Sequence, residues 1–268
     1  MELIGYTAAI LIGISLGLIG GGGSILTVPI LVYFFHIDPV IAGTYSLVVV
    51  GITSAVGSLS HYYKGNVNFK TVFVFGIPSL TAIFLMRKFV MPAIPFVVFK
   101  LGIHSITKPF LLMVCFAILM VAASISMIGK RNLQGDFFQE VGVQPNYYWL
   151  FVFGILIGII TGFVGVGGGF LIIPALVIVA GMPMKKAVGT SLMIMTLSSL
   201  IGVTGDLFSN QPIHYVFILI FSGFAVFGII GGTYLGKYIS NERLKPAFGW
   251  FVLAMGIFIF INTLTHQF

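Results

Sequence analysis

Long apolar runs alternate with short polar connectors along the whole chain. Most runs approach or exceed the ~20 residues that cross a bilayer as a helix, so they predict membrane-spanning helices. Two runs, 24–35 and 170–181, are shorter. A helix of about 12 residues reaches roughly 18 Å, well short of a hydrocarbon core about 30 Å thick, and these two are expected to be half-helices. The expected apolar segments are 3–19, 24–35, 42–60, 71–86, 110–128, 147–164, 170–181, 187–205, 215–235 and 246–264.

A glycine cluster precedes each half-helix. The first is GGGGS at Gly20–Ser24, and the second is GVGGG at Gly165–Gly169. Such clusters do not stay helical cheaply, because each glycine costs roughly 1 kcal/mol relative to alanine. Backbone that unwinds at membrane depth has to line a cavity or be buried in protein, since lipid cannot satisfy its amides. We therefore expect both clusters to line a cavity, whereas isolated glycines such as Gly51 and Gly76 are explained by close helix crossing.

The two glycine clusters belong to an internal duplication. The segment 17–32 shares eight identities in sixteen positions with 162–177, and a Gly-Thr pair follows in each half. The chain is therefore expected to consist of a first transmembrane repeat, 1–128, a central polar connector, 129–146, and a second transmembrane repeat, 147–268. Paired, interrupted apolar segments at matching positions of two halves are the best sequence indication of a transporter binding site. The identical pairs are Gly17/Gly162, Gly20/Gly165, Gly22/Gly167, Gly23/Gly168, Leu26/Leu171, Pro29/Pro174, Leu31/Leu176 and Val32/Val177, and the Gly-Thr pairs are Gly43-Thr44 and Gly189-Thr190.

The direction of the chain after the first glycine cluster decides how the second half is oriented. A single kinked span over 3–35 would be about 50 Å long and would leave roughly 20 Å of apolar helix outside the hydrocarbon. A reversal at the glycines avoids this and gives five elements in each half. Because five is odd, the second repeat is then inverted relative to the first. The expected fold is an all-α polytopic membrane protein with two inverted repeats, each with about four spanning helices plus a glycine-broken half-helix.

Basic residues in the connectors indicate which face is cytoplasmic. With five elements in each half, nine Lys and Arg lie in connectors on one face and four on the other, all four within 87–108. The richer face is expected to be cytoplasmic, with both termini outside. An even number of spans also gives nine against four, so the charge pattern leaves both counts open. The 87–108 connector is expected to lie at the membrane interface as an amphipathic segment. The connectors with nine basic residues are 61–70, 129–146, 182–187 and 236–246.

Composition excludes a soluble globular protein. Hydrophobic side chains make up 59% of the 268 residues and charged ones 7%, against roughly 25% charged residues in soluble domains. The net charge of +7 is explained by membrane topology and not by nucleic-acid binding. The first apolar run has no basic region or cleavage site before it, so we expect it to be retained. The single cysteine, Cys115, is expected to serve packing.

No pattern of catalytic or metal-binding residues stands out. The five histidines are scattered without ligand spacing, and neither glycine cluster is followed by the Lys-Ser/Thr of a phosphate loop. We therefore expect no enzyme activity, no metal and no cofactor. His61 and Asp206 close corresponding helices, but a role in proton coupling is the less favoured interpretation. Lys185 and Lys186 are expected to set topology, and they would also concentrate an anion that enters from the cytoplasm.

The residues after each glycine cluster predict an anion site. A short helix that begins at Ser24 or Phe170 presents unsatisfied N–H groups and a positive dipole end, and glycines let an anion approach those amides. No buried cation is expected in this site. Hydroxyl groups on the following helices are expected to donate to the anion, with simple N-capping as the alternative. The expected substrate-binding residues are Gly20, Gly21, Gly22, Gly23, Ser24, Thr44, Tyr45, Ser46, Gly165, Gly167, Gly168, Gly169, Thr190 and Ser191.

The repeated glycine motif, the prolines Pro29 and Pro174 and the two Gly-Thr motifs resemble those of the TauE/SafE family of sulfite exporters. The resemblance covers nearly the whole chain. It implies export of sulfite or of organosulfonates such as sulfoacetate across a bacterial cytoplasmic membrane, and some family members are proposed to move other sulfur compounds or organic anions. The first half departs from the second at Ser24 and Tyr45, which leaves the exact substrate open.

The leading hypothesis is a multi-pass secondary transporter of the bacterial cytoplasmic membrane that exports small sulfur-containing anions by alternating access. Its partners would be the anion, sulfite or a sulfonate, and the lipid bilayer, without nucleic acid, and a homo-oligomeric state stays open. An anion that leaves a cell with a negative interior gains roughly 2.3 kcal/mol per charge per 100 mV, so export needs no coupled ion. The alternatives are a transporter of another small organic or sulfur anion and a non-transporting intramembrane scaffold.

Overall fold

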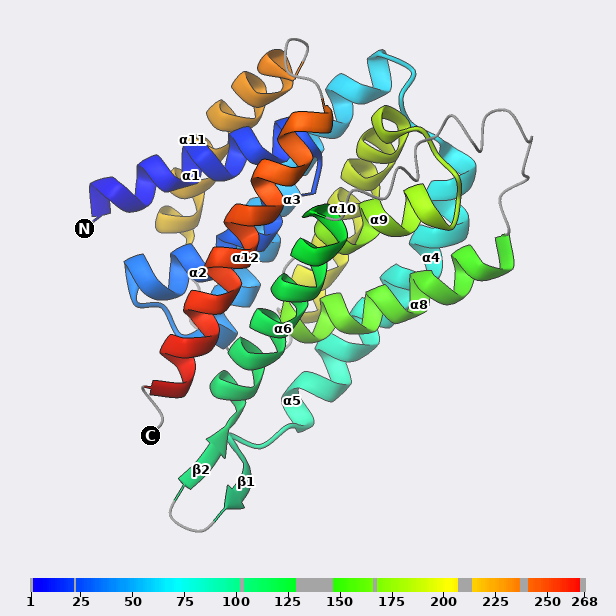
Figure 1. The fold of residues 1–268 in the computed structure, drawn as a ribbon. Helices are drawn as coiled ribbons and strands as arrows, with labels where there is room; N and C mark the ends of the chain where they lie inside the picture. Colours follow the sequence, from blue (N-terminus) through cyan, green and yellow to red (C-terminus); the bar gives the residue numbers. More distant parts are fainter. Residues whose placement is uncertain are drawn as a thin grey trace.

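Helices make up most of the described chain. The computed structural model describes residues 2–21, 23–101, 104–128, 147–165, 168–206, 214–236 and 241–265, so the central connector lies outside the described residues. The elements are α1 (Glu2–Ile19), α2 (Ser24–Phe35), α3 (Pro39–Tyr63), α4 (Phe69–Leu85), η1 (Met86–Val90), α5 (Met91–Ala93), β1 (Val97–Leu101), β2 (His104–Thr107), α6 (Lys108–Ile128), α8 (Tyr147–Val164), α9 (Gly169–Ile178), α10 (Met184–Asp206), α11 (Tyr215–Leu235) and α12 (Asn241–Thr265) (Figure 1). Among the described residues, six spans are long and apolar enough to cross a membrane, which confirms a helical polytopic membrane protein.

One short β-hairpin, which the sequence reasoning did not predict, lies within the otherwise helical chain. β1 pairs antiparallel with β2, and the hairpin projects from one end of the bundle (Figure 1). Its Val- and Phe-rich sequence suits a strand, and a helix is disfavoured at the residue before Pro95. The expectation of an amphipathic interfacial segment over 87–108 is wrong. The first part of this segment extends α4 through η1, a π-helical turn, to complete the span Phe69–Ala93.

The half-helices α2 and α9 are short, with 12 and 10 residues. The reversal expected at the first glycine cluster is confirmed, because the ring of Phe35 at the end of α2 lies 5.6 Å from the ring of Tyr6 near the start of α1. A Cβ atom on Gly23 would lie 2.5 Å from Cγ of Leu16, so α2 begins against the last turns of α1. α1 and α2 therefore form an antiparallel pair and not one kinked span.

Glycines at four-residue spacing bring α1 close to α11. Gly13 and Gly17 of α1 face Gly228 and Gly232 of α11, and a Cβ atom on Gly17 would lie 2.6 Å from the carbonyl oxygen of Ile229. Small residues at this spacing let two backbones approach closely within a membrane. Residue numbers rise together along the contact, so the two helices are parallel. α8 packs against α4 and η1 in the same way, through Gly154, Gly158 and Gly162.

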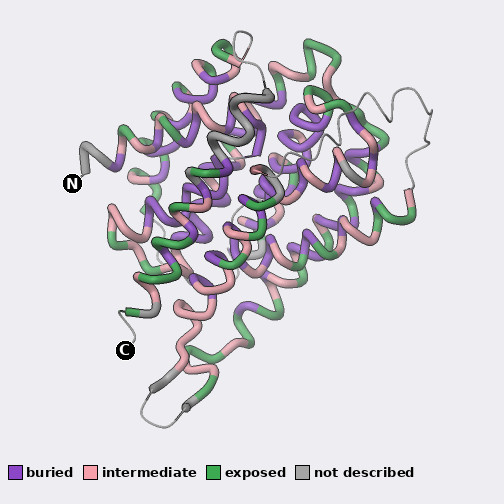
Figure 2. The backbone as a smooth tube through the Cα atoms, viewed as in Figure 1, coloured by how far each residue is buried: buried purple, intermediate pink, exposed green. Residues whose placement is uncertain are grey.

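α3 and α10 cross the middle of the molecule in opposite directions. Thr196 Oγ1 donates to Ser54 Oγ over 3.1 Å near their midpoints. The backbone N–H of Asn68, beyond the C-terminal end of α3, donates to Thr190 Oγ1 near the start of α10 over 3.0 Å. Buried residues concentrate in this middle layer of the bundle (Figure 2). The antiparallel pair therefore forms the centre around which the other helices pack.

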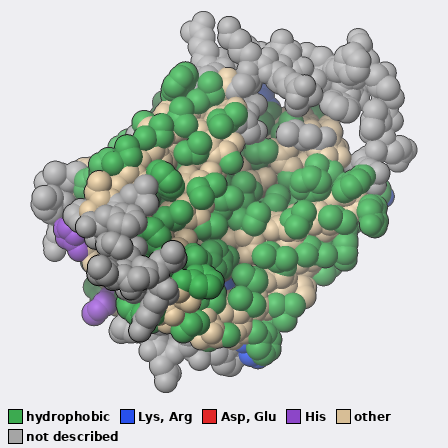
Figure 3. Space-filling model, turned by 60° about the horizontal axis from the view of Figure 1, so that its bottom comes forward, with side chains coloured by type: hydrophobic (Ala, Val, Ile, Leu, Met, Phe, Trp, Pro, Cys, Tyr) green, Lys and Arg blue, Asp and Glu red, His purple; other side chains and the backbone are tan. Residues whose placement is uncertain are grey.

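The outward-facing side chains of the bundle are largely apolar. Phe73, Leu219 and Phe227 are 61%, 65% and 75% exposed, and hydrophobic side chains cover most of the described surface in Figure 3. Soluble monomers rarely expose contiguous apolar patches larger than a few hundred Å², whereas hydrocarbon is a good solvent for such a surface. This surface is therefore the lipid-facing surface of the protein.

Candidate functional site

Both glycine clusters break their helices through left-handed backbone. The aligned residues Gly20 and Gly165 have φ angles of 81° and 79°, in a region that residues with a Cβ rarely adopt. The two breaks also touch, because a Cβ atom on Gly169 would lie 3.0 Å from Cα of Gly21. The unwound backbone is thus buried in protein here, one of the two environments open to it at membrane depth. Gly22 and Gly167 lie outside the described residues.

The half-helices begin without a side-chain cap from any described residue. Gly23 and Gly168 occupy the N-cap positions of α2 and α9. Ser24 Oγ donates instead to the carbonyl oxygen of Gly21 over 2.8 Å and so stabilises the first break. The positive end of each short helix is therefore bordered by glycine backbone.

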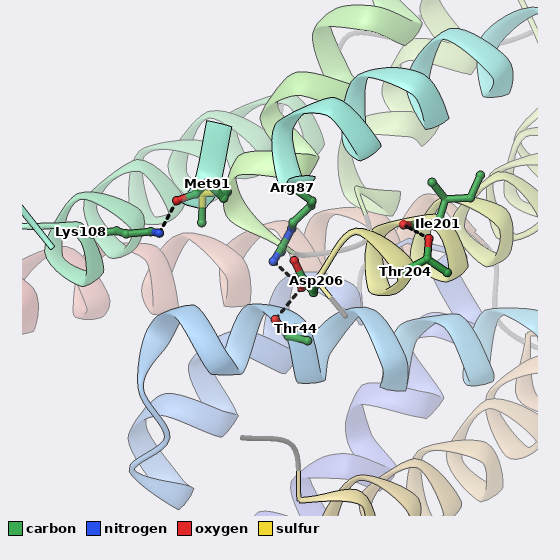
Figure 4. Close-up of polar contacts among 7 residues, drawn as sticks. All are labelled: Thr44, Arg87, Met91, Lys108, Ile201, Thr204 and Asp206. Carbon is green, nitrogen blue, oxygen red and sulfur yellow. Dashed lines mark hydrogen bonds and ion pairs between the residues drawn. The ribbon is translucent and has the colours of Figure 1, made fainter. Parts of the chain in front are cut away.

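A buried cluster of three polar side chains lies beside the second break. Arg87 Nη1 donates to Asp206 Oδ2 over 2.8 Å, and Thr44 Oγ1 donates to the same oxygen over 2.6 Å (Figure 4). The side chains of Arg87 and Asp206 are 3% and 7% exposed. The cluster joins η1, α10 and α3, so it ties together segments that are far apart in the sequence.

Arg87 lies at the candidate site, and the sequence reasoning did not place it there. Its guanidinium lies against two glycines: a Cβ atom on Gly43 would lie 3.3 Å from Nη2, and one on Gly165 would overlap it. The expectation of a site without a buried cation is therefore wrong. Arg87 was assigned to the interfacial connector 87–108 because its charge ends the apolar run at residue 86. An ionisable residue inside a span is by itself a signal of function.

The π-helical turn η1 gives Arg87 its position. A π-helical turn inserts an extra residue into the helical register and often occurs at functional sites. Lys108, at the start of α6, donates from Nζ to the carbonyl oxygen of Met91 over 2.5 Å, directly after this turn (Figure 4). This hydrogen bond joins α5, which precedes the β-hairpin, to α6, which follows it, at the end of the span that carries Arg87.

The expected hydroxyl groups lie inside helices and not at their starts, so the N-capping alternative is wrong. Asp38 caps α3 by accepting from the backbone N–H of Val40 over 2.8 Å. Tyr45 Oη instead accepts from the backbone N–H of His214, the N-cap residue of α11, over 2.8 Å. Thr190 Oγ1 accepts from the backbone N–H of Asn68, the N-cap residue of α4, over 3.0 Å. Ser46 Oγ is buried without a partner among the described residues, and Ser191 Oγ donates to the carbonyl oxygen of Val188 over 2.8 Å.

A basic cavity adjoins the first break. It has a volume of about 200 Å³, and its lining includes Gly17, His61, Lys64, Lys185 and Val188. A Cβ atom on Gly20 would lie 3.0 Å from Cβ of Val188, so the glycine break lies directly behind the cavity wall. The cavity also brings together three of the connectors expected on the basic face, 61–70, 182–187 and 236–246. With an even number of spans in each half, the connector 61–70 would lie on the opposite face of the membrane from 182–187 and 236–246.

A second, larger cavity lies at the other end of α3. Its volume is about 770 Å³, and Asp38, Ile41, Tyr45 and His214 contribute to its lining. α3 has 25 residues, or roughly 37 Å of helix, and the basic cavity lies at its opposite end. The Arg87–Asp206 pair and the second glycine break contact α3 at Thr44 and Gly43, near the end of α3 that borders the large cavity. Within the described part of the chain, no group of three His, Cys, Asp or Glu is placed to hold a metal ion.

Comparison with known proteins gives matches along nearly the whole chain. Residues 6–259 match the family model described as sulfite exporter TauE/SafE. The chain is 30% identical over 255 residues to a probable membrane transporter protein of Xylella fastidiosa, covering 93% of this chain and 91% of that one. It is 26% identical over 244 residues to the probable membrane transporter protein YunE of Bacillus subtilis, covering 85% of each. No solved structure matches.

Proposed function

Because the chain belongs to the sulfite exporter TauE/SafE family and is a multi-pass bacterial membrane protein, we propose that it is a secondary transporter that exports small sulfur-containing anions such as sulfite and sulfoacetate. The observation that carries this proposal is the buried guanidinium of Arg87 against the second glycine break. Buried ionisable groups in spans mark substrate and ion pathways. The planar fork of arginine suits oxyanions that accept two hydrogen bonds.

The two halves are inverted repeats in this proposal. α3 and α10 follow the two glycine breaks at matching sequence positions, and their antiparallel course is what an inverted pair requires. The exchange of partners supports the same arrangement, because the first helix of each half, α1 or α8, packs on the fourth helix of the other, α11 or α4. The gathering of 61–70 and 182–187 around one cavity favours five elements in each half.

Alternating access is supported by the two cavities at opposite ends of α3. One is lined by Lys64 and Lys185 and the other by Asp38 and Tyr45. The glycine breaks offer backbone that adopts several conformations without a steric penalty from a Cβ atom. A transporter of inverted repeats exposes its central site to each side in turn by rocking one repeat against the other.

The basic cavity is the cytoplasmic entrance in this scheme. Connectors that carry most of the basic residues converge there, as the positive-inside rule requires of the cytoplasmic face. Lys64 and Lys185 raise the local concentration of anions. The membrane potential then drives the anion outward with roughly 2.3 kcal/mol per charge per 100 mV.

Efflux from proteoliposomes tests this function. Vesicles loaded with sulfite or sulfoacetate are given a potassium diffusion potential that is negative inside, and the external anion is measured over time. We expect efflux that exceeds that of protein-free vesicles and rises with the potential. If folded, monodisperse protein moves neither anion, the proposal is rejected, and the non-transporting scaffold becomes the better explanation.

A further inference from the structure

The second glycine break holds two buried polar atoms that have no partner among the described residues. They are Nε of Arg87 and Oγ1 of Thr161, and each residue is only 3% exposed. A buried donor or acceptor without a partner carries a desolvation cost, so it calls for an explanation. One explanation is a ligand that supplies the missing hydrogen bonds.

Both atoms border the same short stretch of backbone. The guanidinium of Arg87 lies so close to Gly165 that a Cβ atom there would overlap it, and Thr161 Oγ1 stands in the same relation to Gly168. Gly168 is the N-cap residue of α9, which has no side-chain cap. The cation lies against Gly165, the hydroxyl group lies against Gly168, and the positive end of α9 begins at Gly168. All three groups favour an anion.

Among the described residues, the first glycine break has the positive end of α2 but neither the cation nor the unpartnered hydroxyl group. Leu16 takes the place that Thr161 has in the second half, and a Cβ atom on Gly23 would lie 2.5 Å from its Cγ atom. α4 and α11 are the corresponding helices of the two halves. When positions are counted from their N-cap residues, Asn68 and His214, Thr233 of the second half corresponds to Arg87 of the first. In the part of the chain that the structure describes, the second break thus carries a cation and an unpartnered hydroxyl group, whereas the hydroxyl groups of Ser24 and Thr27 at the first break donate to its own carbonyl oxygens.

We propose that the second break is the anion-binding site of the transporter, where Arg87, Thr161 and the first amides of α9 hold one sulfite or sulfonate group. When the anion is absent, the carboxylate of Asp206 pairs with the guanidinium of Arg87 in its place. This assignment rests on the proposed transport function. An uncompensated buried guanidinium is strongly unfavourable, so an empty site needs an internal carboxylate. An incoming anion exchanges with that carboxylate, and Arg87 stays paired throughout.

The hydrogen bonds of the pair suit such an exchange. Arg87 donates to Asp206 from Nη1, while its Nε has no partner among the described residues. The oxygen of Asp206 that accepts it also accepts from Thr44. Asp206 therefore keeps a partner on α3 when the anion takes its place. Thr44 adjoins Tyr45, which lines the large cavity, so the exchange takes place next to that cavity.

Calorimetric titration of the purified full-length protein with sulfite and with sulfoacetate tests the assignment. Asp206→Asn removes the competing carboxylate and keeps a polar partner for Thr44, so the affinity is expected to rise at least tenfold. Thr161→Val is expected to weaken binding about tenfold. The matched control is Thr27→Val in the first break, where Thr27 Oγ1 donates to the carbonyl oxygen of Gly23, and its affinity should stay within twofold of the wild type.

The double variant Arg87→Gln/Asp206→Asn removes both charges, so no unpaired charge is left to prevent folding. Monodisperse double variant should lose at least a hundredfold in affinity, and wild-type affinity in that variant overturns the assignment. If it does not fold, the comparison of Thr161→Val with Thr27→Val decides, and equal affinities overturn the assignment. If the wild-type protein moves neither anion, the transport function itself is rejected. If the wild-type protein transports the anion but the variants bind it with unaltered affinity, only the assignment of this site is rejected.

Discussion

Gly21 and Gly169 lie backbone to backbone at the point where the two glycine breaks meet. A Cβ atom on Gly21 would lie 2.5 Å from the carbonyl carbon of Gly169 and 2.8 Å from Cδ1 of Ile173. Neither distance leaves room for a methyl group, and the atom on Gly169 belongs to the backbone. The contact therefore depends on glycine.

We expect Gly21→Ala to lower the free energy of unfolding by about 1–3 kcal/mol, the usual cost of overpacking. Thermal unfolding in detergent measures this as a lower Tm. The matched control is Gly231→Ala on α11, where no described atom beyond its chain neighbours and the backbone of its own helix lies within 4 Å of the added Cβ. That variant should keep or slightly raise the Tm, because alanine favours helix. Equal Tm values for the two variants would show that the breaks do not touch.

A second prediction separates backbone strain from loss of space around Arg87. Gly165 and Gly65 both have positive φ angles, 79° and 68°, but only at Gly165 does a Cβ atom overlap the guanidinium. Alanine costs roughly 1–2 kcal/mol at either position through strain alone. We expect Gly165→Ala to cost more than Gly65→Ala and to abolish sulfite efflux, while Gly65→Ala transports at the wild-type rate. Efflux that survives in both variants contradicts the assignment of this break.

The basic cavity should govern how fast anions reach the site. Lys64→Gln/Lys185→Gln removes two charges from its lining, and we expect kcat/KM for sulfite efflux to fall about threefold to tenfold at low ionic strength. The deficit should shrink in 1 M salt, where the Debye length is about 3 Å. Lys70→Gln is the control, because Lys70 lies over the ring of Tyr147 at 4.4 Å and outside the cavity. A deficit that does not depend on salt argues against steering.

Alternating access predicts reciprocal changes in exposure at the two cavities. In a Cys115→Ala background, Ile41→Cys reports on the large cavity and Thr233→Cys on the basic one. Adding sulfite should raise the rate of maleimide labelling at one position and lower it at the other. Labelling rates that change in the same direction at both positions, or at neither, would be incompatible with a rocking motion.

The half-helices and their breaks were predictable because glycine runs and apolar run lengths act locally. A cluster such as Gly20–Ser24 cannot propagate a helix, and a short apolar run cannot cross the hydrocarbon, whatever packs around it. The left-handed φ angles at Gly20 and Gly165 and the antiparallel contact of Tyr6 with Phe35 follow from these constraints.

The ion pair was not predictable in the same way, because its energy depends on contacts between distant segments. Arg87 and Asp206 are 119 residues apart, and each one reads as the polar end of an apolar run. A buried charge needs a partner of opposite charge or hydrogen bonds beside it, and the sequence alone does not show which residue provides them. The start of α3 is a different case: Asp38 followed by Pro39 is a local N-cap signal, and the expected segment began too late because it was judged by apolar residues alone.

The partner exchange between the halves has a consequence for biosynthesis. α1 packs closely against α11, and α8 against α4, so neither half contains all the surfaces that its own helices need. α1 leaves the ribosome early, yet its glycine face meets its partner only after most of the chain has been made. We therefore expect membrane insertion of the helices to precede their final assembly, and a half produced alone to need its complement before it becomes resistant to proteolysis.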